Sequence, residues 1–285
     1  MNFSFRFSHG FTDSPPENHS AAIPARNSGG KPFLEIVLFG ALVTAFLGAR
    51  PYDHQLFLAL NALHSPLTDR LWWFITHTGD GLVLGVLVGA AVVIRPRVAL
   101  AGVVLLLVCS LFVHVLKALL PSPRPWTCLD DVHVVGQVLR SGSFPSGHAG
   151  AGLALALAVV RYGGSGLVGW LAVLLGGAIG VSRVFVGAHF PGDVLAGMAV
   201  ASASAVLVHV TLGPCIKRWI PERPDFSNPF VRVMLVLEIG AAAGASLLYG
   251  PFFAPAPAVA MLLGLAALIF VLACWMRERS SEPFA

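Results

Sequence analysis

The sequence predicts an all-α fold: a polytopic helical membrane protein with a six-span core and two additional C-terminal spans. Of its 285 residues, 56% are hydrophobic and only 11% are charged, whereas about a quarter of the residues of a soluble domain are charged. The apolar residues gather in runs of the length that crosses a bilayer. The formal net charge of +4 lies in no dense basic stretch, so it indicates membrane orientation and not binding to nucleic acid.

The two ends of the chain are expected to be cytoplasmic tails. Residues 1–32 are rich in Ser, Pro, Asn and Gly and contain no apolar run, which predicts disorder. A charged start followed at once by an apolar core is missing, so we expect no signal peptide. Residues 277–285 form the second tail, after the last apolar run.

Six apolar segments within residues 33–213 form the expected core. Residues 51–66 mix polar and apolar positions and predict an amphipathic segment at the membrane surface. The second span combines residues 68–79 with the apolar run 82–94, because a run of about 13 residues is too short to cross a bilayer. The polar break at 76–81 predicts a kink in this span. The other core spans are expected at 33–49, 98–120, 148–160, 166–188 and 194–212.

Lysines and arginines gather at alternate ends of these spans and orient the chain. A basic loop at 214–230 follows the core, and residues 231–276 hold two further spans, 231–249 and 256–275. Three cations remain outside at the ends of spans, and exceptions of this kind tend to be functional. These three are Lys117, Arg124 and Arg183. The cations that this path places inside are Arg26, Lys31, Arg95, Arg97, Arg161, Lys217, Arg218, Arg223, Arg277 and Arg279.

Three polar islands lie at the edges of apolar runs, at residues 117–125, 143–148 and 182–193. The expected topology brings all three to the outer membrane face. Together they hold three cations, two histidines, one carboxylate and a helix start that contains glycine. This inventory suits catalysis on a phosphate group.

His189 and Asp193 are four residues apart, which is one helical turn. Pro191 suits the first turn of a helix, where its missing N–H costs nothing, so we expect a helix to begin near Phe190. A carboxylate in that turn accepts a hydrogen bond from one ring nitrogen of His189 and leaves the other as a free lone pair, as nucleophilic attack requires. A capping aspartate beside an interfacial histidine explains the same pair equally well.

Residues 145–148, Pro-Ser-Gly-His, lead directly into the fourth span. The N–H groups of a helix start bind anions, and Gly147 permits close approach to its backbone. Ser146 adds a hydroxyl donor, and His148 can give a proton to a leaving alkoxide. An N-cap serine followed by a chance histidine is the plainer explanation of this segment taken alone.

The three outward cations match the needs of a phosphoryl group. Arginine forks bind oxygens bidentately and lysine acts as a point charge, so Lys117, Arg124 and Arg183 together can cover the equatorial oxygens of the transition state. Single basic residues at membrane ends more often extend to the lipid headgroups.

Taken together, the three islands resemble the signature of the type 2 phosphatidic acid phosphatases, a lipid phosphatase family that shares its site with the vanadium haloperoxidases. The family pattern is KxxxxxxRP, then PSGH, then SRxxxxxHxxxD. The sequence matches every position of this pattern from Lys117 to Asp193. The six-span core around these residues fits the family as well.

The resemblance implies a role for each matched position. His189 would attack phosphorus and form a phosphohistidine, Asp193 would orient it, and His148 would protonate the leaving group and then activate water. The groups that would hold the phosphate are Lys117, Arg124, Ser146, Gly147 and Arg183. No metal or other cofactor is implied, because the cations neutralise the phosphate and the islands lack the second carboxylate cluster of a two-metal site.

The function that the resemblance implies is that of an integral membrane lipid phosphatase in the bacterial inner membrane, with its site facing the periplasm and its lipid phosphate substrate in the outer leaflet. Among the usual bacterial substrates of the family, we rank undecaprenyl pyrophosphate first because of its biological role and not because of any residue. Phosphatidylglycerophosphate, phosphatidic acid and a lipid A phosphate follow. A phosphotransferase with a second lipid as acceptor and a lipid transporter without catalysis stay open. The vanadium haloperoxidases of this group are soluble, and the high hydropathy of the sequence argues against that function. The sequence predicts no oligomeric state.

Overall fold

The computed structural model describes residues 32–136, 138, 140, 142–163, 166–225, 228–237 and 240, and the secondary structure of these residues is helical throughout, with no strand among them. The expected tails and most of the two added C-terminal spans lie outside this described part. The expected all-α fold is therefore confirmed for the core, and the added spans stay a prediction.

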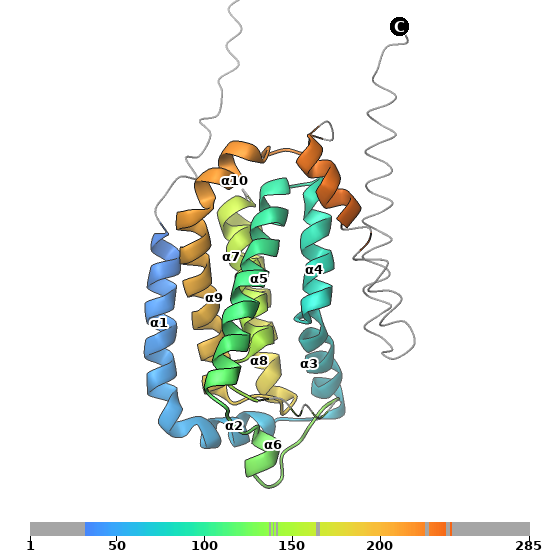
Figure 1. The fold of residues 1–285 in the computed structure, drawn as a ribbon. Helices are drawn as coiled ribbons and strands as arrows, with labels where there is room; N and C mark the ends of the chain where they lie inside the picture. Colours follow the sequence, from blue (N-terminus) through green and yellow to red (C-terminus); the bar gives the residue numbers. More distant parts are fainter. Residues whose placement is uncertain are drawn as a thin grey trace, which may run out of the picture. The chain divides into compact units, whose positions relative to one another are not determined.

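A bundle of long helices makes up the described chain (Figure 1). Helix α2 runs across one end of the bundle, near the short α6, and α10 lies at the opposite end. The helices are α1 (Phe33–Ala49), α2 (Asp53–Asn61), α3 (Pro66–Thr78), α4 (Gly81–Ala90), α5 (Pro96–Leu119), α6 (Pro125–Cys128), α7 (Gly147–Tyr162), α8 (Gly166–Phe185), α9 (Pro191–Thr211) and α10 (Gly213–Trp219), with 3₁₀ turns at Arg50–Tyr52 and Ala91–Val93.

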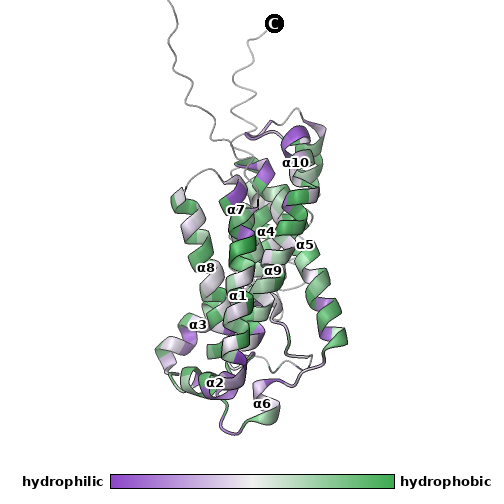
Figure 2. Cartoon of the chain, turned by 90° about the vertical axis from the view of Figure 1, so that its left-hand side faces the viewer, coloured by the Kyte–Doolittle hydropathy of each residue, from purple (hydrophilic) through white to green (hydrophobic). Residues whose placement is uncertain are grey.

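Four helical stretches of the described chain are long and apolar enough to cross a membrane: Phe33–Asn61, which comprises α1, the first 3₁₀ turn and α2, and the single helices Pro96–Leu119, Gly166–Phe185 and Pro191–Thr211. Apolar residues run along the helices, while hydrophilic residues gather towards the two ends (Figure 2). The chain is therefore an integral membrane protein.

The expected second span is bent, and the expected fourth is short. Pro66–Thr78 and Val83–Val93 together make a fifth candidate span with a bend of 56°, at the polar break where the sequence predicts a kink. Helix α7 has only 16 residues, fewer than the roughly 20 of a straight crossing. The described helices thus give four or five spans by length, and the predicted six is not reached.

Small residues let α7 sit close to its neighbours in the middle of the bundle. A Cβ atom on Gly176 of α8 would lie 2.9 Å from the carbonyl oxygen of Gly152 on α7. A Cβ atom on Gly197 of α9 would collide with the carbonyl oxygen of Ser146, at the start of α7. Glycine at both positions therefore allows the backbones to approach closely, as in other membrane helix pairs.

Of the cations that the sequence assigns to the cytoplasm, those in the described part of the chain lie towards the α10 end of the bundle. Arg97, at the start of α5, donates to the carbonyl oxygens of Lys217 at 3.2 Å and Ile220 at 2.9 Å, and lies 3.5 Å from Glu222. Arg161, near the end of α7, lies 3.8 Å from Glu35. These contacts agree with a common side for the basic loops.

A buried ionic contact joins the first helix to the bundle. Glu35 on α1 is 3% exposed and lies 2.8 Å from Nδ1 of His209 on α9, which is 5% exposed. Arg161 approaches the same carboxylate oxygen. Charged groups at this depth are costly unless they are paired, so this contact fixes how α1 packs along α9.

We expect Glu35→Ala to lower the free energy of unfolding by about 2 kcal/mol or more, because the buried His209 would lose its carboxylate partner. A single interhelical hydrogen bond in a membrane contributes only about 0.6 kcal/mol on average. Thermal unfolding in detergent measures the difference. The control is Thr44→Ala, at an exposed position of α1, and an equal unfolding midpoint for the two variants would contradict the assignment.

Candidate active site

All eight residues that the sequence singles out lie at one end of the bundle, where α5 and α8 end and α7 and α9 begin; we call it the motif end (lower part of Figure 1). Five chain segments meet there. They are the end of α5, the loop 120–146, the turn between α8 and α9, and the first turns of α7 and α9. Spacing in the sequence placed each island at a helix end, and the bundle brings the ends together.

A tight turn between α8 and α9 presents His189. The backbone N–H groups of Ala188 and His189 both donate to the carbonyl oxygen of Arg183, at 3.0 and 3.1 Å. Gly187 has a φ of +75°, and a Cβ atom there would lie 2.5 Å from the carbonyl oxygen of His133. Only glycine fits this conformation and this close approach, so the turn holds His189 at a fixed distance from Arg183.

Helix α9 begins at Pro191 with Phe190 as its N-cap, as the sequence predicts. Oδ2 of Asp193 accepts a hydrogen bond from the N–H of Phe190 at 3.0 Å, which is the capping contact that the sequence left open as an alternative. The carboxylate therefore caps the helix and still faces His189. The backbone carbonyl oxygen of Asp193 accepts a hydrogen bond from the N–H of Ser146 at 2.9 Å. This bond joins the start of α7 to the start of α9.

Ser143 stands between the expected catalytic partners. Nδ1 of His189 lies 3.6 Å from Oδ2 of Asp193, too far for a direct hydrogen bond. Oγ of Ser143 lies 2.5 Å from that carboxylate oxygen and 3.3 Å from Nδ1 of His189. The expected direct contact between His189 and Asp193 is thus replaced by a bridge through a buried hydroxyl.

This bridge specifies one histidine tautomer. A hydroxyl has one proton to donate, and a carboxylate only accepts, so Ser143 donates to Asp193. Ser143 then accepts from Nδ1–H of His189, and the lone pair of the imidazole is left on Nε2. This lone pair lies on the side of the ring that faces away from Ser143.

Arg124 covers that side of the imidazole. Its Nη1 atom donates to the carbonyl oxygen of Ala188 at 2.7 Å and lies 3.5 Å from Nε2 of His189. Lys117 donates from Nζ to the carbonyl oxygens of Gly142 at 2.7 Å and Ser143 at 3.1 Å. Both cations therefore hold the backbone beside the histidine as well as adding positive charge.

Arg183 and His148 complete the site from the side of α3. Arg183 is 5% exposed, and its Nη1 atom donates to Oγ1 of the buried Thr76 in a short hydrogen bond. A Cβ atom on Gly79, between α3 and α4, would lie 3.4 Å from Cδ2 of His148, so this ring lies beside the bend between the two helices. His148 lies within electrostatic range of Arg183 and His189.

The local field favours a neutral imidazole and an anionic ligand. Burial, with the neighbouring cations Arg183, Arg124 and Lys117, holds the pKa of His189 well below its usual value, so the ring is neutral at pH 7 and Nε2 keeps its lone pair. Two buried donors, Oγ of Ser146 and Nε of Arg183, have no hydrogen-bond partner among the described residues. Buried donors normally have one, and the oxygens of a phosphate would supply it.

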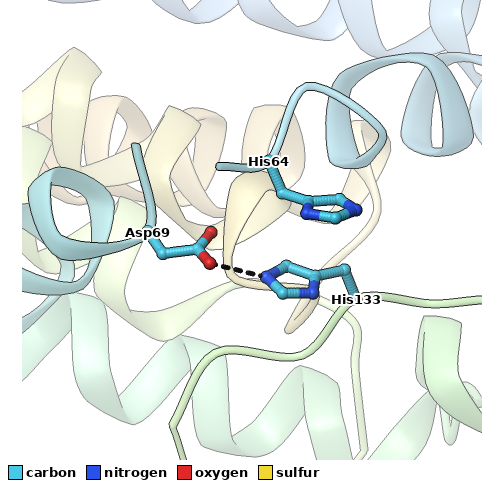
Figure 3. Close-up of side chains that lie close together, drawn as sticks. All are labelled: His64, Asp69 and His133. Carbon is cyan, nitrogen blue, oxygen red and sulfur yellow. Dashed lines mark hydrogen bonds and ion pairs between the residues drawn. The ribbon is translucent and has the colours of Figure 1, made fainter. Parts of the chain in front are cut away.

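The eight residues do not form a metal site in the described part of the chain. There, the one group of His, Cys, Asp and Glu side chains spaced for a shared ion is His64, Asp69 and His133 (Figure 3). None of the predicted site residues belongs to it. The donors of the motif end are mainly cations and N–H groups, which suit an anion.

Several supporting residues were not identified from the sequence. Ser143 stands in the second island, but its role depends on a fold that brings residue 193 beside it. Thr76 and Asp53 contact the site from 107 and 139 residues away, at Arg183 and Gly192. Contacts between residues so far apart in the sequence leave no local pattern. The available signal was that Asp53 and Thr76 are polar residues next to apolar runs.

Comparison with known proteins agrees with this geometry. Residues 97–217 match the model of the PAP2 superfamily. The undecaprenyl-diphosphatase BcrC of Bacillus subtilis is 30% identical over 158 residues, which are 52% of this chain and 78% of that protein. The bacitracin transport permease protein BcrC of Bacillus licheniformis is 27% identical over 110 residues, 39% of this chain and 53% of that protein.

Two solved structures share the fold. LpxE of Aquifex aeolicus superposes with a TM-score of 0.52 and 26% identity, covering 55% of this chain and 93% of that one. A transmembrane PAP2-type phosphatidylglycerolphosphate phosphatase of Bacillus subtilis gives a TM-score of 0.52 and 25% identity, covering 66% and 98%. The chain therefore belongs to the PAP2 superfamily, within which it is an integral membrane phosphatase.

Proposed function

We propose that the chain hydrolyses a lipid phosphate or a polyprenyl pyrophosphate through a phosphohistidine at His189. One observation carries the proposal: a buried, neutral imidazole oriented through Ser143 faces three cations, beside two buried donors that lack a partner among the described residues. A phosphoryl group placed there meets a nucleophile and a positive field at once.

In the first step, Nε2 of His189 attacks phosphorus and the bond from phosphorus to the leaving oxygen breaks. Nδ1–H stays hydrogen-bonded to Ser143, so Asp193 stabilises the positive charge that develops on the ring. His148 gives a proton to the leaving alcohol or phosphate. The products of this step are the phosphohistidine and the free leaving group.

In the second step, His148 takes a proton from water, and the hydroxide oxygen attacks phosphorus. The bond between phosphorus and Nε2 breaks, inorganic phosphate leaves, and His189 is neutral again. Throughout, the oxygens of the phosphoryl group are held by Lys117, Arg124, Arg183, Ser146 and the N–H of Gly147.

For the substrate we propose undecaprenyl pyrophosphate first, followed by phosphatidylglycerophosphate and phosphatidic acid. Support comes from two relatives, one named as an undecaprenyl-diphosphatase and one as a phosphatidylglycerolphosphate phosphatase. We place the chain in the bacterial inner membrane with both termini in the cytoplasm and the motif end facing outward. The lipid tail then stays in the bilayer while the headgroup enters the site.

The test is phosphate release by the detergent-purified chain, in EDTA, across a panel of these three lipids with His189→Asn alongside. We expect metal-independent release that the variant abolishes, with the fastest turnover on the pyrophosphate. Release that His189→Asn retains would overturn the proposed nucleophile. Release that EDTA abolishes at temperatures where the chain stays folded would overturn the metal-independent mechanism.

A second candidate, transport of an anionic lipid without catalysis, draws on the name of one relative, a transport permease. A third keeps the chemistry but passes the phosphoryl group to a second lipid. Adding a lipid alcohol to the assay separates both from hydrolysis. A phosphorylated acceptor indicates transfer, and headgroup binding without release by the folded wild type indicates transport.

Ser143→Ala is expected to lower kcat by about 10–100-fold with little change in KM. The loss removes the bridge that fixes the tautomer of His189 but none of the cations that bind phosphate, and general acid–base contributions of 10²–10⁴ set the upper bound. Steady-state kinetics on the best substrate measure it. Ser143→Thr keeps a hydroxyl and serves as the control; if it is as slow as Ser143→Ala, the bridge is not the cause.

A further inference from the structure

A cluster of side chains that could bind a metal ion lies at the motif end, outside the eight site residues. His64, Asp69 and His133 each offer one ligand atom, and these atoms all lie within 4.8 Å of one another. The three come from three segments: the turn between α2 and α3, the first turn of α3, and the loop after α6 (Figure 3). Residues far apart in the sequence thus converge on one point.

We propose that His64, Asp69 and His133 bind one divalent metal ion of the zinc class and that this ion holds the loop after α6, which carries His133, against the bundle. Two imidazole nitrogens and one carboxylate oxygen are ligands that zinc prefers, and a water would fill the fourth position of the tetrahedron. The ion is structural and separate from the phosphate chemistry.

The distances fit an ion after one small movement. Zinc bonds of 2.0–2.2 Å place the ligand atoms of a tetrahedron about 3.4 Å apart. Nε2 of His133 and Oδ2 of Asp69 already lie 3.0 Å apart. The rings of His64 and His133 stack with centroids 4.0 Å apart and planes 13° apart, so their lone pairs lie in two nearly parallel planes and do not converge on one point between the rings. The exposed His64 therefore rotates to direct a nitrogen at the ion.

The charge balance also fits. Without metal, the shared proton of the pair lies between Nε2 of His133 and Asp69. An entering zinc ion takes the place of that proton between the two atoms, and the proton moves to Nδ1 of His133, so that the metal binds a neutral imidazole. The carboxylate then offsets part of the ion's charge.

The backbone of His133 explains what the ion would brace. Its N–H donates to Oδ1 of Asn61 at 2.9 Å, and its carbonyl oxygen accepts from Nδ2 of Asn61 at 2.9 Å. The same carbonyl lies against Gly187, and Val135 donates to the carbonyl of Val186 at 3.2 Å. An ion on His133 therefore clamps the loop onto the turn that presents His189.

The test uses the full chain, purified in detergent without a polyhistidine tag and stripped with EDTA that is then removed. Zinc chloride is titrated by calorimetry, and cobalt(II) is titrated in parallel by its visible absorption. We expect one ion per chain, a tetrahedral cobalt spectrum, and a zinc-dependent rise in the midpoint of thermal unfolding. None of these readouts depends on phosphatase activity.

His64→Gln is the decisive variant, because the exposed side chain is removed without disturbing the pair of Asp69 and His133. We expect its zinc affinity to fall by more than about 100-fold, since even outer partners of a metal ligand cost 10–100-fold. Asp69→Asn should behave in the same way. The control is His114→Gln, an exposed histidine on α5. Zinc binding that is absent, or unchanged in His64→Gln, would show a plain hydrogen-bonded pair and overturn the site.

Discussion

Replacing His189 by asparagine is expected to lower phosphate release by at least about 10⁴-fold, because the loss of a covalent nucleophile removes the whole double-displacement route. The neighbouring cations stay in place, so binding of the phosphate headgroup should persist. His148→Ala is expected to lose about 10²–10⁴-fold, the contribution of a general acid and base. The two histidines thus have separable effects.

Labelled substrate, with the reaction stopped in alkali, distinguishes them further. With a pyrophosphate, whose leaving group needs little protonation, His148→Ala should still transfer label to His189 and then hydrolyse it slowly. A phosphohistidine, stable in base and labile in acid, should accumulate in His148→Ala and be absent in His189→Asn. Label in both variants, or in neither, would contradict the assignment of attack to Nε2 of His189.

Arg183→Ala is expected to lower kcat/KM by about 10³–10⁵-fold, the range for an arginine that neutralises a phosphoryl transition state. Arg183 is buried and has a free Nε donor among the described residues, and its backbone carbonyl also holds the turn of His189. Arg183→Lys should recover little, because lysine cannot reproduce the planar fork. Steady-state kinetics on the best lipid measure both.

Two further variants separate charge from position. Thr76→Val removes the hydroxyl that orients Arg183 and should cost about tenfold, near the value of one hydrogen bond to a charged group. Arg70→Ala removes an exposed arginine of the same end of the bundle and should leave the rate unchanged. If Arg70→Ala and Arg183→Ala lose activity equally, general surface charge and not a local clamp binds the phosphate.

The sequence predicted that the three islands meet at one end of the bundle, because each island is short and sits at a helix end. The four-residue spacing of His189 and Asp193, with Pro191 between them, predicted the start of α9 correctly. The polar break at 76–81 predicted the bend of 56° in the second span. Local spacing determines both features, so no knowledge of the fold was needed.

Other features depend on contacts between distant segments. The hydropathy pattern predicted the fourth span as the apolar run 148–160. The helix α7 has 16 residues, and its close packing against Gly176 and Gly197 determines its position in the bundle. The bridge through Ser143 requires residues 143, 189 and 193 to meet at one point. The cluster of His64, Asp69 and His133 spans 69 positions, from 64 to 133, and each member alone resembles an ordinary surface residue.

The contact between Asp53 and α9 has a consequence for how the enzyme meets the bilayer. Oδ1 of Asp53 accepts the N–H of Gly192 at 2.7 Å, and Arg50 pairs with the same carboxyl group at 2.8 Å. Asp53 begins α2, the helix that lies across the end of the bundle and that the sequence predicts at the membrane surface, so we expect the depth of α2 in the membrane to set the depth of His189. Bilayers of different thickness would then raise or lower the nucleophile relative to the phosphate plane, and turnover would follow acyl-chain length.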